Sequence, residues 1–108
     1  MKVTDDEMER AVMFLASSDE NYARAKSYFN GLDRQTKTIK AMAFIRSAEK
    51  TAAGKEQEAY VSPAYRAHLE KMENAELEYL TLQEQRNTSI VMIDVWRSLN
   101  SARAKGVL

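Results

Sequence analysis

The sequence of 108 residues contains no cysteine, which excludes disulfide frameworks, thiol catalysis and zinc sites built on cysteine. Its three glycines and one proline are too few for the many turns of an all-β domain. No apolar run approaches the roughly 18 residues that a membrane-spanning helix needs. Acidic and basic residues number 16 each, so net charge does not indicate a protein that coats a polyanion. These absences predict a single helical domain over residues 1–108, located in the cytoplasm and without membrane contact.

Hydrophobic residues make up 44% of the chain and recur at steps of three and four, the period of helices. Thr4 and Glu7 have the spacing of a capping box and predict a short helix over about 4–16. A pair of serines follows this segment and predicts a break, after which a new helix starts. That second helix is expected over about 18–50 and continues through Gly31, because the apolar phase is the same on both sides of it.

Ser62 and Pro63 predict the start of a third helix over about 62–103, with serine as N-cap and proline as the first helical residue. The connection over 51–61 contains Gly54 and is expected to hold at most a short helical turn. We therefore predict an all-α fold, in which a short N-terminal helix precedes a long, coiled-coil-like antiparallel helical hairpin. The third helix has an apolar stripe, and a polar gap over residues 83–89 interrupts this stripe between Leu82 and Ile90.

Charge alternates in sign along the chain, with net values of −4, +6, −5 and +3 for residues 1–20, 21–55, 56–84 and 85–108. In an antiparallel hairpin the basic arm of the second helix lies beside the acidic arm of the third. Such pairs contribute little stability individually when they are exposed, but they disfavour a wrong register.

Two long helices cannot bury all of their own apolar surface, and the segment 90–96 is hydrophobic nearly all round. We therefore expect a homo-oligomer, in which a second copy of the chain covers part of that surface. The candidate interface residues are Arg86, Ile90, Ile93, Trp96 and Arg97. An equally weighted alternative is that Arg86 extends its stem over apolar surface and Trp96 belongs to the core of its own chain.

Few residues point to catalysis. His68 is the only histidine, and the residue three positions before it is a tyrosine, not the glutamate of a di-iron motif. We expect His68 to be an exposed or partly buried helix residue. The sequence also has no glycine-rich phosphate loop and no nucleophile with a recognisable base. A non-enzymatic protein without catalytic residues, metal site or cofactor is therefore expected.

Four cations of the second helix fall on roughly one side of it: Lys26, Arg34, Lys37 and Lys40. This basic stripe carries no acidic residue in our interpretation, and it is a candidate for contact with DNA phosphates. The alternatives are a solvated face or a partner for the acidic block of the third helix. Tyr28 lies off the core phase of the other aromatic residues considered, and it is the one candidate for stacking on a base.

The second half of the chain resembles small all-helical proteins of bacteriophages and prophages. The resemblance covers residues 50–103 and is carried by Lys50-Thr51, Gly54-Lys55-Glu56, Glu58-Ala59-Tyr60, Ser62, Tyr65, Val95-Trp96-Arg97-Ser98-Leu99 and Ala102-Arg103. Those proteins are encoded in early modules for DNA recombination and replication. The resemblance implies a viral accessory protein in the bacterial cytoplasm, and it supplies no catalytic motif.

Two functions follow as expectations. The first is a non-enzymatic accessory protein of phage DNA recombination or replication, which acts through protein contacts and weak DNA binding. The alternative is an oligomeric structural or adaptor protein that binds a phage or host protein, for example as an inhibitor of host defence, without touching nucleic acid.

Overall fold

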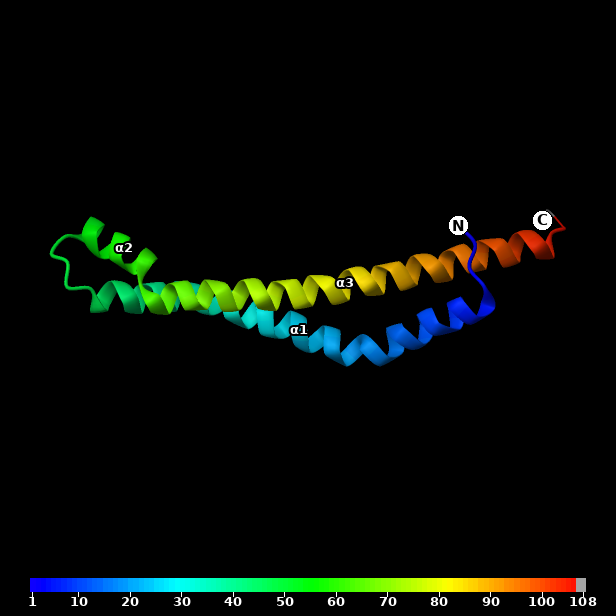
Figure 1. The fold of residues 1–108 in the computed structure, drawn as a ribbon, viewed down its shortest axis with the longest axis horizontal. Helices are drawn as coiled ribbons and strands as arrows, with labels where there is room; N and C mark the ends of the chain where they lie inside the picture. The colour runs from blue at the N-terminus through cyan, green and yellow to red at the C-terminus, as the bar shows by residue number, and fades with distance from the viewer. Residues whose placement is uncertain (107–108) are drawn as a thin grey trace. The chain divides into compact units, whose positions relative to one another are not determined.

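The computed structural model describes residues 1–106 and confirms the all-α fold (Figure 1). Its helices are α1 (Asp5–Arg46), α2 (Ala52–Val61) and α3 (Pro63–Ala104). No strand occurs in this described part of the chain. Among the same residues, no helix has a stretch both long enough and apolar enough to span a bilayer.

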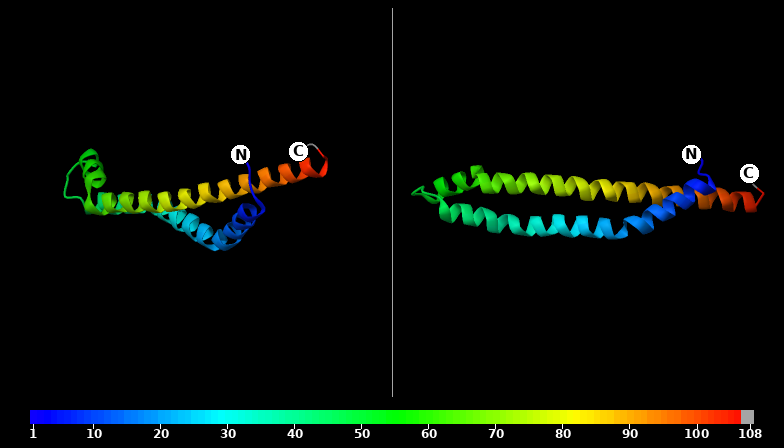
Figure 2. Two further views of the ribbon diagram at one scale, coloured as in Figure 1. Left: turned by 45° about the vertical axis from the view of Figure 1, so that its right-hand side comes forward. Right: turned by 60° about the horizontal axis from the view of Figure 1, so that its bottom comes forward.

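The chain forms two compact units. The first, here called the terminal unit, consists of residues 1–23 together with 80–106, and the second, the hairpin unit, consists of residues 24–79. Helices α1 and α3 each contribute a segment to both units. Within each unit the two segments are antiparallel, and in the hairpin unit they run side by side, with the short helix α2 at the end where α1 leads into α3 (Figure 2).

A seam of buried residues at seven-residue spacing joins the two long helices. The buried residues of α1 on this seam are Ala11, Ser18, Ala25 and Leu32, and those of α3 are His68, Ala75 and Ser89. This spacing is the heptad repeat of a coiled coil. The seam therefore continues through the polar gap of α3, where it includes the buried polar residue Ser89.

The capping patterns at two helix starts are confirmed. The Glu7 amide donates to Thr4 Oγ1 at 3.1 Å, and the Glu7 carboxylate accepts from the Thr4 amide at 3.3 Å. At the start of α3, Ser62 Oγ accepts from the Tyr65 amide at 3.3 Å, and Pro63 is the first helical residue. Both patterns are complete within four residues, so local sequence is enough to determine them.

The break expected at the serine pair is wrong, because α1 is continuous from Asp5 to Arg46. The hydroxyls of Ser17 and Ser18 donate to the carbonyls of Phe14 and Leu15, at 3.3 and 3.4 Å. They thus bond back to the preceding turn instead of capping a new one. The predicted continuity through the Asn-Gly pair further along α1 is confirmed.

The connection over 51–61 also differs from expectation, because it is occupied by the ten-residue helix α2. Thr51 caps this helix, and its hydroxyl accepts from the Gly54 amide at 3.0 Å. Gly54 therefore lies in the first turn of α2 and not at the bend. The bend comes earlier, where Ser47 Oγ donates to Glu58 of α2 at 2.7 Å and accepts from the Glu49 amide at 3.1 Å.

Candidate interaction surfaces

The basic stripe lies on α1 within the hairpin unit, and one of its four members is engaged inside the chain. Lys40 Nζ donates to the Tyr60 hydroxyl at 2.5 Å and to Glu56 Oε1 at 3.4 Å, and it lies 3.8 Å from the centre of the Tyr60 ring. The hydrogen bond to Tyr60 raises the pKa of the Lys40 ammonium above its ordinary value, and Glu56 adds to this against the opposing effect of desolvation. The assignment of Lys40 as a DNA-facing residue is therefore not supported by its contacts with α2.

The remaining cations of the stripe, Lys26, Arg34 and Lys37, are exposed. The interpretation that no acidic residue lies among them is wrong. Asp33 is exposed and stands seven residues from both Lys26 and Lys40 on the continuous helix α1, which places all three on one line of its surface. The stripe thus carries a smaller positive charge than its lysines and arginine indicate. Tyr28 is half exposed, as expected of a residue outside the core phase.

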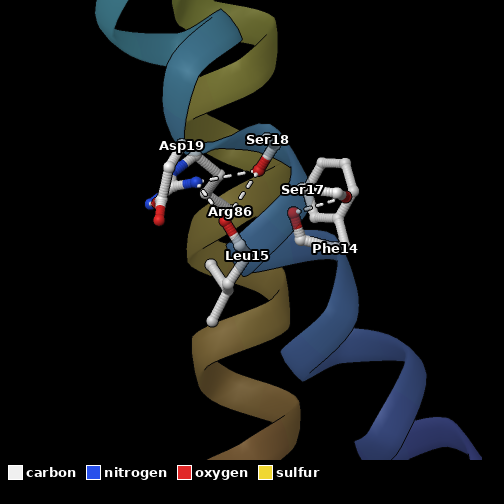
Figure 3. A network of polar contacts seen from close by, with 6 residues as sticks. All are labelled: Phe14, Leu15, Ser17, Ser18, Asp19 and Arg86. Carbon is white, nitrogen blue, oxygen red and sulfur yellow. Dashed lines mark hydrogen bonds and ion pairs between the residues drawn. The ribbon is translucent and has the colours of Figure 1, made fainter.

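Arg86, a candidate interface residue, is the centre of a polar network inside the terminal unit (Figure 3). Its guanidinium reaches across from α3 and donates to the Leu15 carbonyl at 2.9 Å, to Ser18 Oγ at 2.8 Å and to Asp19 Oδ1 at 2.7 Å. It also lies 5.1 Å from the centre of the Tyr22 ring. A guanidinium on a helix seam requires such partners, because an unpaired buried charge is costly. Arg86 therefore joins α1 to α3 within the terminal unit.

Trp96 is likewise used within the chain. Its indole nitrogen donates to Asp5 Oδ1 at 2.7 Å, and its ring is partly buried, as is Ile93. Ile90 and Arg97, in contrast, are exposed, and Arg97 makes a long surface ion pair of 3.5 Å with Asp94. Of the five candidate interface residues, three therefore pack inside the terminal unit and two face solvent.

His68 is buried, with 6% of its surface exposed, so the expectation of an exposed or partly buried residue is wrong. Its Nε2 lies 3.0 Å from Thr36 Oγ1, and that hydroxyl also lies 3.3 Å from the Leu32 carbonyl and 3.1 Å from Met72 Sδ. These contacts make His68 and Thr36 a hydrogen-bonded polar layer of the seam. Thr36 stands seven residues after Phe29, which belongs to the apolar stripe of α1. This seven-residue spacing could have predicted that Thr36 lies on the seam.

An apolar groove, here called the α2 groove, lies in the hairpin unit where the end of α1, helix α2 and the start of α3 meet. It has a volume of about 500 Å³ and is lined by Ile39, Met42, Ala43, Arg46, Ser47, Glu58, Ser62, Pro63 and Ala64. Met42, one of these lining residues, is exposed. The sequence reasoning missed the groove, because it depends on α2 being a helix.

Comparison with known proteins adds no assignment: no family, no curated protein and no solved structure matches this chain. Within the described residues, no group of three or more histidine, aspartate or glutamate side chains is arranged to hold a metal ion. The residues therefore form three surfaces on which function can be argued: the α2 groove, the reduced basic stripe and the exposed side of the terminal unit.

Proposed function

We propose that this chain is a non-enzymatic accessory protein that acts through protein contacts, with the α2 groove as its contact surface. The observation that carries the proposal is the groove itself, an apolar hollow of about 500 Å³ bounded by three helices. Exposed apolar side chains that gather at one place on a small protein are typical of an interaction site. In the groove the exposed Met42 lies among further apolar lining residues, which are Ile39, Ala43, Pro63 and Ala64.

The occupant that fits the groove best is an amphipathic helix of another protein. Its apolar residues at helical spacing would enter between α1 and α3, as in other grooves that bind helices. Arg46 lies in the lining and is exposed, whereas the neighbouring Glu58 accepts a hydrogen bond from Ser47. A carboxylate beside the apolar residues of the partner helix would complement Arg46.

The resemblance to phage and prophage proteins supports a setting in the bacterial cytoplasm, with a phage or host protein as the partner. A role in DNA recombination or replication and a role as an adaptor or inhibitor of host defence both use the same groove. A homo-oligomer is a separate proposal, which concerns the terminal unit.

Weak binding to DNA phosphates is a second candidate function, favoured by the three exposed cations Lys26, Arg34 and Lys37. Lysine and arginine bind nucleic acid mainly by neutralising phosphates, so this affinity would fall steeply with salt. Asp33 within the stripe and the engagement of Lys40 by α2 both reduce it.

The groove is tested by capturing proteins from phage-infected bacteria on the full chain and then purifying each captured protein. Binding of the purified protein is measured by calorimetry to the unmodified chain, to Met42→Glu and to Leu77→Glu. Leu77 is the matched control, because it is an exposed apolar residue of the same unit outside the groove. The proposal expects binding that Met42→Glu abolishes and Leu77→Glu preserves. Equal binding by all three proteins would contradict it.

A further inference from the structure

The terminal unit presents an apolar edge beside its seam. Val12 follows the buried Ala11 on α1, and Ile90 follows the buried Ser89 on α3, so each lies one position outside the seam. Their exposed fractions are 45% and 48%. The residues at seven-residue spacing through these two positions are Asp5, Val12 and Asp19 on α1, and Gln83, Ile90 and Arg97 on α3. We call these six residues the terminal edge.

Heptad geometry places the two lines of the terminal edge on the same flank of the antiparallel helix pair. The opposite flank supports this placement, since Phe14 of α1 and Met92 of α3 line one hollow together with Ala11 and Ser89. Val12 and Ile90 therefore lie at the same level along the seam, and Asp5 lies at the level of Arg97.

Apolar residues beside the seam indicate more than two helices. In a coiled coil of two helices, each helix needs apolar residues at only two positions of the heptad. In a larger bundle, each helix also has an apolar residue at a position next to these two. The hairpin unit shows the two-helix pattern, because four of its five residues at the equivalent positions are charged: Lys26, Asp33, Lys40, Leu69 and Glu76. In the terminal unit two of the six positions are apolar, Val12 and Ile90, and charged residues stand at three of the others.

We infer that a second copy of this chain packs on the terminal edge, with the two-fold axis parallel to the helices. This axis places Val12 of one copy against Ile90 of the other. It also places Asp5 against Arg97 of the second copy, so that two ion pairs of opposite charge form at the symmetric interface. Ile90 and Arg97 are the two candidate interface residues that the chain leaves exposed.

The alternative two-fold axis, perpendicular to the helices, is disfavoured by charge. With that axis, α1 of the second copy runs antiparallel to α1 of the first, and the two Val12 side chains meet at the centre. Asp5 of each copy then lies against Asp19 of the other. Two carboxylates would then meet at each end of the interface, and although Arg86 pairs with Asp19 in its own chain, Asp5 would lose the attraction to Arg97 that the parallel axis provides. The charge pattern of the edge thus selects one of the two arrangements.

Sedimentation velocity of the full chain over the micromolar range tests the interface. The unmodified chain is expected to be a dimer and Ile90→Lys a monomer with unchanged helicity by circular dichroism. Leu69→Lys is the matched control, because Leu69 holds the equivalent heptad position in the hairpin unit and is 42% exposed. It is expected to remain a dimer. A monomeric unmodified chain, or a dimer of Ile90→Lys, overturns the inference.

A charge exchange tests the arrangement. Arg97→Glu and Asp5→Lys should each weaken the dimer roughly tenfold or more, because two ion pairs become repulsive. An equimolar mixture of the two variants should form a heterodimer at least tenfold tighter than either variant alone, since each pair again joins opposite charges, although Asp5→Lys also removes the hydrogen bond from Trp96 within its own chain. Failure of the mixture to associate contradicts the parallel axis. Neither result depends on the α2 groove, which lies in the other unit.

Discussion

The terminal unit and the hairpin unit are built from the same two long helices and the same heptad seam, yet they differ in what surrounds the seam. In the hairpin unit, Phe29 of α1 and Tyr79 of α3 stack with ring centres 5.9 Å apart, and charged residues flank them. In the terminal unit the seam contains Arg86 with its hydrogen bonds, and Val12 and Ile90 flank it. The periodicity determines which residues of the two helices pair, whereas the residues beside the seam differ between the two units.

The largest effect is expected from truncating the hairpin seam at Leu32, which is buried. Leu32→Ala should lower the free energy of unfolding by about 3 kcal/mol, because it removes buried apolar surface and leaves a cavity. Urea unfolding followed by circular dichroism measures this. Leu77→Ala, at an exposed position of the same unit, should change the free energy by less than about 0.5 kcal/mol. Similar losses in the two variants would show that the seam does not stabilise the hairpin unit.

The terminal unit should depend on Arg86 in a comparable way. Arg86→Ala removes three hydrogen bonds and the packing of the side chain on α1, and it should cost about 2 kcal/mol in the same unfolding experiment. Arg97→Ala is the control, because the ion pair of Arg97 with Asp94 is exposed and contributes little. Dimer dissociation is kept out of this comparison by measuring both variants in the Ile90→Lys background. An Arg86→Ala protein as stable as the Arg97→Ala protein would contradict the role of the network.

The polar layer of the hairpin unit should show coupling between its two members. Thr36→Val leaves the buried His68 without its hydrogen bond and should cost about 1 to 2 kcal/mol. His68→Leu leaves Thr36 able to bond to the Leu32 carbonyl and should cost less. The double variant should be more stable than the sum of the single effects indicates, by about 1 kcal/mol. Additive effects would show that the two side chains do not act as a pair.

The sequence predicted those features that are complete within one turn or one helix. The Thr4 and Ser62 caps and the continuity of α1 through Gly31 are of this kind. The serine pair misled the prediction because a serine hydroxyl can cap a new helix or bond back to the preceding turn. Here Ser18 also accepts from Arg86, 68 residues further along the chain.

Features that depend on the register of two helices were not predictable in the same way. His68 was judged by its own neighbours in the sequence, but its environment is determined by Thr36 of α1. The sequence did not distinguish interface residues from residues that pack within the chain. Trp96 is an example, because its partner Asp5 lies at the other end of the sequence. A heptad count on both helices would have placed His68 on the seam and Ile90 beside it.

The smallest effect compares two glycines that both lie in helices. Gly31→Ala should stabilise the chain by about 0.5 to 1 kcal/mol, because glycine is a poor helix former. A methyl group there would have Arg34 Nη2 as its nearest neighbour, at 3.8 Å. Gly54→Ala should gain little or lose stability, because its methyl group would lie 3.0 Å from Thr51 Oγ1 and 3.3 Å from Glu49 Cβ. Thermal unfolding of both variants measures the difference. A larger gain at Gly54 than at Gly31 would mean that the cap of α2 yields easily, and that the α2 groove is less firmly shaped than its contacts indicate.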